Sequence, residues 1–289
     1  MYIYINNIRQ ENYMTDFEKS INRNMTQNKF ESIQRHVYGD GGDTFSYNYG
    51  AVSSWFTWHR DKSGKIAEAD PPDNRFVGGQ WKSVYDGSIE NWNDWFASKL
   101  TTDIIFLGLN MSGEGKIELD LKGKRIPYFQ NARGHGKIVD TFFDTMAEGG
   151  YFTDIIKPDK RINEEILRIN EKRLKQNKTP FSFSDGAVVK RIISKRPDIL
   201  KDHIQIFKDE LLFIGADKPL LIVFEDLKNE NKGDISWILK QEGLGKKFID
   251  ERFHAIVKIM HYSSYPPGSF YEGWKNDTRE KLKKYINIP

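Results

Sequence analysis

The chain has 289 residues, 38% of them hydrophobic and 29% charged, with a formal net charge of +3, which is typical of a soluble globular protein with a substantial core. No stretch approaches the roughly 18 consecutive apolar residues of a membrane span, and the first residues lack the features of a signal peptide, so we expect a cytoplasmic protein with no membrane partner. The absence of cysteine excludes disulfides, thiolate nucleophiles and cysteine-ligated metal sites, and the mild positive charge is compatible with a nucleic-acid partner without arguing for one.

Residues 1–100 show little clear periodicity and are rich in aromatic side chains. Residues 16–30 are predicted to be helical, and so are residues 88–99, where Ser88 is a suitable N-cap. Five of the seven tryptophans lie here, and we expect most of them to pack in the core: Trp55, Trp58, Trp81, Trp92 and Trp95. We interpret residues 1–100 as an elaboration packed on a domain formed by residues 101–289.

Residues 103–107 form a short apolar run that predicts a buried strand. We expect the chain to turn immediately afterwards, because Gly108 and the glycines that follow it tolerate a positive φ. Asn110 and Ser112 would then be polar side chains in the mouth of this turn. Open α/β sheets bind ligands at such strand ends, although many strands end this way for packing reasons alone.

Strands and helices alternate along the rest of the chain. The predicted strands are residues 151–156, 219–225 and 254–260, and the predicted helices are residues 137–148, 159–178, 199–213, 233–243 and 271–285. This alternation predicts an α/β fold, a three-layer α/β/α sandwich around a mainly parallel four-stranded sheet. The stretch 159–178 is highly charged, and we expect a solvent-exposed outer helix there rather than a nucleic-acid contact.

Polar groups lie at the ends of three of these strands: Asn110 and Ser112, then Asp154, then His261 and Ser263. Their order and spacing resemble the uracil-DNA glycosylase superfamily over roughly residues 100–289. The corresponding stretches read Gly108-Leu-Asn-Met-Ser-Gly113, Tyr151-Phe-Thr-Asp-Ile-Ile-Lys157 and His261-Tyr-Ser-Ser-Tyr265. The prolines of the first and third family motifs are missing, so the resemblance rests on the joint order of the three motifs.

This resemblance implies a role for each strand end. Asn110 would position the attacking water, Asp154 would read the base, and His261 would stabilise negative charge on the departing base as a neutral imidazole donor. The other implied contacts are Tyr128 or Phe129 as the ring that stacks on the extruded base, Tyr265 as the wedge in the duplex, and Ser263, Ser264 and Lys157 as contacts to DNA. Without the resemblance, each of these residues is also compatible with a structural role, and Lys157 with that of a surface lysine near the groove.

Two departures from the uracil-reading pattern bear on the substrate. Asp154 stands where an asparagine reads uracil, and an ionised carboxylate only accepts hydrogen bonds, so it would repel O4 of uracil and accept from N4 of cytosine; protonation would alter this preference. Ser112 stands where uracil-specific members carry a tyrosine against C5, which leaves room for a C5 substituent.

We therefore expect a monomeric DNA glycosylase, without cofactor or metal, that removes a C5-modified cytosine from phage DNA in anti-phage defence. A uracil or damaged-base repair glycosylase, a non-catalytic nucleic-acid-binding protein on the same fold, and a hydrolase or sensor of free nucleotides remain open alternatives.

Overall fold

The computed structural model describes most of the region after residue 143 and several shorter segments before it. The described residues are 15–39, 46–49, 53–56, 98–110, 138, 141–142, 144–183, 185–225, 233–241, 244–261 and 270–288.

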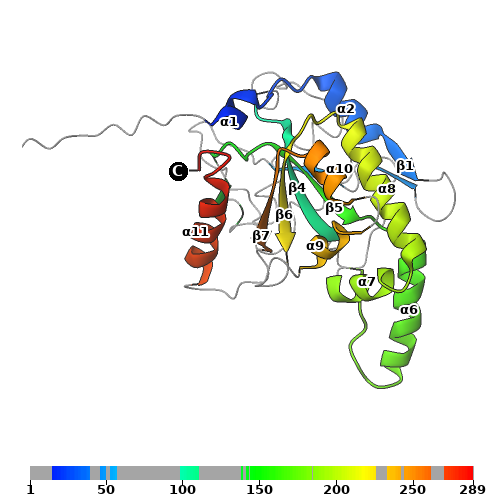
Figure 1. Cartoon of the computed structure of the whole chain (residues 1–289). Helices are drawn as coiled ribbons and strands as arrows, with labels where there is room; N and C mark the ends of the chain where they lie inside the picture. Colours follow the sequence, from blue (N-terminus) through cyan, green and yellow to red (C-terminus); the bar gives the residue numbers. More distant parts are fainter. Residues whose placement is uncertain are drawn as a thin grey trace, which may run out of the picture.

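The core is a five-stranded sheet in the spatial order β3-β5-β4-β6-β7 (Figure 1). Four strands are parallel, as the sequence predicts: β4 (Thr101–Asn110), β5 (Gly150–Ile156), β6 (Leu220–Glu225) and β7 (Ala255–Met260). The fifth, β3 (Ser53–Trp55), pairs antiparallel with the outer side of β5 and was not predicted. Most residues of the four parallel strands are buried, because both faces of the sheet are covered.

The strand order places β4 at the point where the chain changes direction across the sheet. From β4 the chain moves outward to β5, then returns past β4 to pair β6 on its other side, and continues to β7. In open parallel sheets, ligands bind beyond the carboxyl ends of the strands at this switch point. The carboxyl ends of β4 and β6 are therefore the first place to look for a site.

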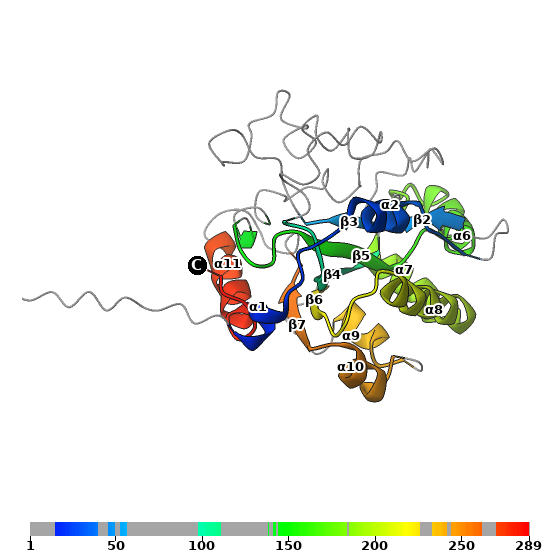
Figure 2. The same ribbon diagram turned by 90° about the horizontal axis from the view of Figure 1, so that it is seen from above.

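Helices cover both faces, which confirms the predicted three-layer α/β/α sandwich (Figure 2). One face carries α6 (Lys160–Leu174), α7 (Gly186–Ile193), α8 (Pro197–Phe213), α9 (Asp234–Ile238) and α10 (Lys246–Arg252). The opposite face carries α1 (Asp16–Ser20), the helical residues 138 and 141–142, and α11 (Phe270–Leu282). None of the helices in the described part of the chain is long and apolar enough to cross a membrane.

The N-terminal region contributes directly to the core. Trp55 and Phe56 are fully buried, and the Phe56 ring stacks on Phe106 of β4 with ring centroids 3.9 Å apart. Residues 53–56 therefore complete the sheet, and the other tryptophans expected in the core lie outside the described residues. The same region also forms a short antiparallel pair, β1 (Val37–Gly39) with β2 (Ser46–Asn48).

The predicted helix over residues 16–30 is wrong, because α1 ends at Ser20 and α2 (Gln27–Arg35) begins separately. Thr15 caps α1, and the Thr26 side chain accepts a hydrogen bond from Lys29 N at 3.2 Å to start α2. Between them the Arg23 guanidinium donates to three backbone carbonyls, those of Lys99, Met146 and Glu148. The segment between the helices is thus held by contacts with chain that is distant in sequence.

Other elements also differ from the prediction, either in where they end or in having been missed. The helix expected over residues 137–148 gives way to turns from Asp144, which has a φ of +58°, and Gly150 already belongs to β5. Helices α7 and α10 were not predicted at all. The remaining predicted helices agree with α6, α8, α9 and α11 to within a few residues, apart from the end of the helix expected over residues 233–243, since α9 stops at Ile238.

Candidate functional site at the carboxyl edge of the sheet

Three of the predicted site residues lie at the carboxyl edge of the parallel strands. Asn110 is the last residue of β4, and Asp154 lies beside Gly108 in the register of β4 with β5. His261 directly follows β7, and its backbone N–H donates to the Glu225 carbonyl at the end of β6 at 2.6 Å. The strands β5 and β7 are three strand spacings apart, about 14 Å.

An aromatic layer connects the two outer positions on one face of the sheet. The ring of Phe152 on β5 lies 6.1 Å from that of Phe224 on β6, and the Phe224 ring lies 5.9 Å from the His261 imidazole in an edge-on arrangement. Asp154 is two residues after Phe152 and projects on the same face, because side chains alternate along a strand. Asp154 and His261 therefore lie at the two ends of the same layer of apolar rings.

Gly108 has a different role from the predicted one. It does not turn the chain but lies inside β4, paired with Asp154. A Cβ at this position would lie only 2.0 Å from Asp154 Oδ1, while its contact with Phe152 would be an ordinary 3.5 Å. The missing side chain of Gly108 thus makes the space that the Asp154 carboxyl occupies.

Replacing Gly108 with alanine is expected to displace the Asp154 carboxyl and to destabilise the protein by about 1–3 kcal/mol, the usual cost of overpacking a core. The double variant Gly108→Ala/Asp154→Ala removes the clashing carboxyl and should regain most of that loss in urea unfolding. If the double variant is as unstable as Gly108→Ala alone, the carboxyl is not what the glycine accommodates.

Asp154 is a buried residue with 6% of its surface exposed, and no hydrogen-bond donor in the described part of the chain contacts its carboxyl. Burial raises its pKa to about 7, although the Lys157 charge opposes the shift. Buried carboxyls are normally hydrogen-bonded. A carboxyl at the carboxyl edge of the sheet that receives no hydrogen bond from the described residues is therefore a group suited to a ligand.

The His261 imidazole is uncharged at neutral pH, because burial lowers its pKa to about 4. A neutral imidazole carries one N–H donor and one acceptor nitrogen. It can therefore donate a hydrogen bond to a developing negative charge without first giving up a proton.

The Asn110 amide has a fixed orientation. Its Nδ2 donates to the backbone carbonyl of Phe183 at 2.5 Å. A carbonyl oxygen can only accept, so the amide nitrogen must face Phe183 and Oδ1 must point the other way. Oδ1 is left as an acceptor that can orient a water molecule but cannot take its proton at neutral pH.

Glu225, at the end of β6, is a buried edge residue that the sequence analysis missed. Its carboxylate accepts from the backbone N–H groups of Ile235 at 3.2 Å and Ser236 at 2.7 Å, at the start of α9. A Cβ on Gly233 would lie 1.9 Å from Glu225 Oε2, so this glycine makes room for the carboxylate. Glu225 holds α9 against the edge, and the glutamate ending an apolar strand was the only sequence signal for it.

The expectation of a surface Lys157 is wrong. Its side chain is fully buried, and Nζ lies 2.9 Å from Glu210 Oε2 on α8 and donates to Thr153 Oγ1. Glu210 Oε1 accepts from the hydroxyls of Tyr151 at 2.7 Å and Thr153 at 2.8 Å. Lys157 therefore belongs to a buried polar cluster beneath β5, and in this conformation it does not reach a phosphate.

A second set of ionic contacts fixes the start of α6. The Asp159 carboxylate lies 3.2 Å from His203 Nε2 and 2.7 Å from the Arg161 guanidinium, which also binds Asp202 on α8 at 2.7 Å. His203 Nδ1 accepts from Lys157 N at 3.3 Å, so its proton lies on Nε2, facing Asp159. Burial raises the pKa of Asp159, but the hydrogen bonds from His203 and Arg161 outweigh it and hold the pKa at about 2.

The remaining predicted site residues lie outside the described residues: Ser112, Tyr128, Phe129, Ser263, Ser264 and Tyr265. Two hollows are formed by described residues, one of about 440 Å³ against β7, α9 and α10, and one of about 410 Å³ at the amino-terminal edge around Asp103. Neither is lined by Asn110, Asp154 or His261. Within the described residues, no three His, Asp or Glu side chains gather as metal ligands.

The chain was compared with family models, curated proteins and solved structures. No family model, no curated protein and no solved structure matches it.

Proposed function

We propose that the protein is a monofunctional DNA glycosylase that hydrolyses the N-glycosidic bond of a flipped-out modified pyrimidine. The observation that carries this proposal is the buried carboxyl of Asp154, which receives no hydrogen bond from the described residues and shares one sheet edge with the neutral imidazole of His261 and the oriented amide of Asn110. The order of these residues is the one that the resemblance to the uracil-DNA glycosylase superfamily implies.

His261 and Asn110 suit the two halves of the reaction, which are the departure of the base and the attack of water on the sugar. Breaking the N-glycosidic bond leaves negative charge on the base and an oxocarbenium-like sugar. His261 donates its imidazole N–H to the anionic base, and Asn110 Oδ1 holds a water molecule against the sugar carbon. The oxocarbenium-like carbon is electrophilic enough for positioned water to attack without a strong base.

Asp154 is suited to reading the edge of the base. In its acid form a carboxyl presents one donor and one acceptor, so its hydroxyl can donate to cytosine N3 while its carbonyl accepts from N4–H. The same acid form can also donate to uracil O4 and accept from N3–H. Because its pKa is about 7, both ionisation states are populated at neutral pH, and the preference for cytosine must rest on contacts with the C5 substituent.

A base-release assay tests this function. Three DNA duplexes, containing uracil, unmodified cytosine or hydroxymethylated or glucosylated cytosine, are incubated with the protein, and alkali then reveals abasic sites. Cleavage of the modified DNA alone supports a role in defence against phages with modified genomes. Cleavage of uracil DNA supports the second candidate, a repair glycosylase, which the uracil-compatible acid form of Asp154 favours. The absence of base release from all three would contradict the glycosylase proposal.

Replacing His261 with alanine is expected to lower the rate of base release by about 10²–10³, the usual loss when one donor to a developing anion is removed. Asn110→Ala should slow the reaction similarly. The matched control is His254→Ala, which removes an exposed histidine immediately before the other end of β7. If the three variants release base at equal rates, the assigned roles are wrong.

A further inference from the structure

The charge of the chain is unevenly distributed. Residues 168–196, the distal part of α6 with the loop and α7 that follow, contain nine Lys and Arg against two acidic residues. We call this segment the basic arm. The whole chain has 44 basic and 41 acidic residues, so the remaining residues carry 35 and 39 and are net negative. The positive net charge of the protein therefore comes from this one segment.

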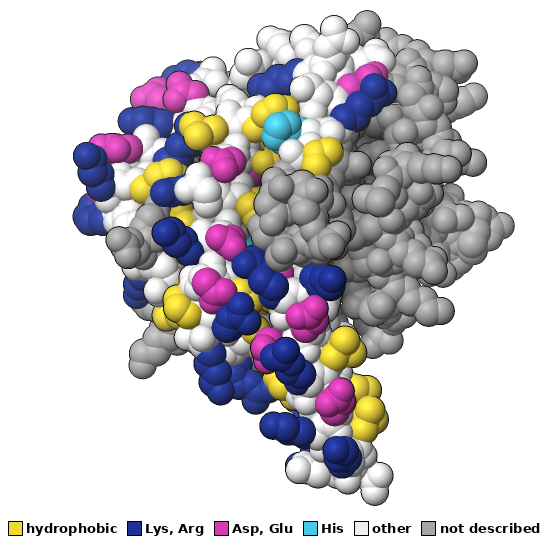
Figure 3. Space-filling model, turned by 90° about the vertical axis from the view of Figure 1, so that its right-hand side faces the viewer, with side chains coloured by type: hydrophobic (Ala, Val, Ile, Leu, Met, Phe, Trp, Pro, Cys, Tyr) yellow, Lys and Arg dark blue, Asp and Glu magenta, His cyan; other side chains and the backbone are white. Residues whose placement is uncertain are grey.

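The basic arm projects past the candidate site. In Figure 1, α6 and the loop after it extend beyond the arrowheads of β6 and β7, on the side of the carboxyl edge of the sheet. Figure 3 shows Lys and Arg side chains gathered over this projection. The hydrogen bond from Asn110 Nδ2 to Phe183 O connects the loop of the arm directly to the end of β4. The arm thus stands beside the proposed position of the extruded base.

The loop of the arm is held firmly against α6. The Asn170 side chain makes a two-point pair with the backbone of Phe181, donating to its carbonyl and accepting from its N–H, both at 2.7 Å. Arg173 donates to Thr179 O at 2.6 Å, and its guanidinium lies 3.8 Å from the centroid of the Phe181 ring. The Asp159, Arg161 and Asp202 contacts anchor the other end of α6 to α8. The arm therefore presents its charges on a rigid support.

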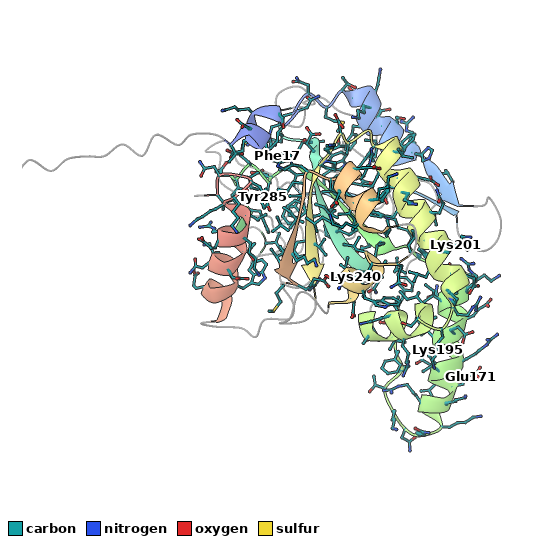
Figure 4. The ribbon with its side chains drawn as sticks, in the orientation of Figure 1. Phe17, Glu171, Lys195, Lys201, Lys240 and Tyr285 are labelled. Carbon is teal, nitrogen blue, oxygen red and sulfur yellow. The ribbon has the colours of Figure 1, made fainter. Side chains whose placement is uncertain are left out.

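Several cations of the arm are not neutralised. Within the described part of the chain, Lys172, Lys175, Arg191 and Lys195 are exposed and make no ion pair, and Figure 4 labels Lys195 at the base of the projection. By contrast, Lys190 is paired with Asp234. Exposed lysines without acidic partners bind phosphate by releasing the counterions of the nucleic acid.

We propose that the basic arm is a phosphate-binding surface that holds the DNA backbone next to the carboxyl edge of the sheet. The part of α6 that belongs to the arm, residues 168–174, is about 10 Å long, which matches about three phosphates at 3.4 Å per step along one strand. This inference extends the proposed function, since DNA is the partner in both, but it concerns binding and not base release. The arm anchors the duplex, while the edge residues act on a single base.

The test measures binding of the full chain to a short fluorescein-labelled duplex of unmodified DNA by fluorescence anisotropy over a range of salt. The arm variant Lys172→Gln/Lys175→Gln/Lys195→Gln removes three charges that make no ion pair with the described residues. The slope of log K against log salt is negative, and its magnitude is expected to decrease by about 2.7, or about 0.9 per lost phosphate contact, with a loss of tenfold or more in affinity.

The control is Lys19→Gln/Lys247→Gln/Lys284→Gln, which removes the same charge from exposed sites on α1, on α10 and just after α11. It should change the slope by less than about 1. Equal slopes for the arm and control variants would overturn the proposal. It would also be overturned if the wild-type protein did not bind the duplex, or if it bound anionic phospholipid vesicles and not the duplex. If binding depends on the arm but no duplex releases a base, the result supports the DNA-binding proposal and contradicts only the glycosylase proposal.

Discussion

Glu210→Leu is expected to destabilise the fold by about 3–5 kcal/mol, the usual cost of removing one partner from a buried ion pair. Glu210 and Lys157 are both fully buried, with Lys157 Nζ 2.9 Å from Glu210 Oε2. Leucine leaves the Lys157 ammonium without its counter-charge, and the hydroxyls of Tyr151 and Thr153 lose their acceptor. Urea unfolding followed by circular dichroism measures the loss.

Two controls separate the ion pair from the rest of the cluster. The double variant Lys157→Met/Glu210→Leu should recover more than half of the loss, because a buried pair replaced by apolar side chains is often close to neutral. Asp250→Ala breaks the exposed pair with Lys246 and should cost less than about 1 kcal/mol. If the double variant is no more stable than Glu210→Leu, the hydroxyl groups and not the charge dominate the cluster.

This cluster explains why Lys157 was misplaced by sequence reasoning. A lysine after a strand is most often solvated, and nothing near it in sequence indicates a partner. Glu210 lies on α8, within a helix whose amphipathic pattern predicted its boundaries but not a buried carboxylate. Burial of a charged pair depends on which two elements pack together, and the packing of α8 under β5 is a property of the tertiary structure.

Gly108 illustrates a different limit of prediction from sequence. The apolar run before it correctly predicted a buried strand, and the glycine was taken as the end of that strand. In the structure the strand continues to Asn110, and the glycine is needed because the Asp154 carboxyl occupies its side-chain space. A glycine after an apolar run has the same local signal whether it turns the chain or accommodates a neighbouring strand. Only the register of β4 with β5 distinguishes the two.

The parallel strands and the order of polar groups were predictable because they depend on short-range patterns. Asn110 and His261 end or follow an apolar run and Asp154 lies two residues before the end of one, and parallel strands bring such ends to one edge. Edge strand β3 was not predictable in this way, because it has only three residues and pairs with chain almost a hundred residues away. The same applies to the bond between Asn110 and Phe183, which fixes the amide orientation.

Asp154→Asn is expected to stabilise the protein at alkaline pH and leave it unchanged in acid. The folded-state pKa of about 7 lies above the ordinary value of 3.8, so between these two values the folded protein keeps a proton that the unfolded chain has lost. The contribution of Asp154 to stability therefore falls as pH rises through this window and stays low above it. Three pKa units correspond to about 4 kcal/mol, an upper limit for the gain of the variant at about pH 8, with no gain near pH 3.5.

The ionisation of Asp154 is also expected to make the rate of base release depend on pH. If the base edge is read by the acid form of Asp154, the wild-type rate should fall up to tenfold per unit above about pH 7 as the hydroxyl donor is lost. Asparagine presents a donor and an acceptor at every pH, so Asp154→Asn should retain activity and lose this alkaline decline. The matched control is Asp103→Asn at the opposite edge, where burial also raises the pKa of the carboxyl. Asp103→Asn should keep the wild-type alkaline decline, and an unchanged decline in Asp154→Asn would assign the titration to another group and remove Asp154 from base recognition.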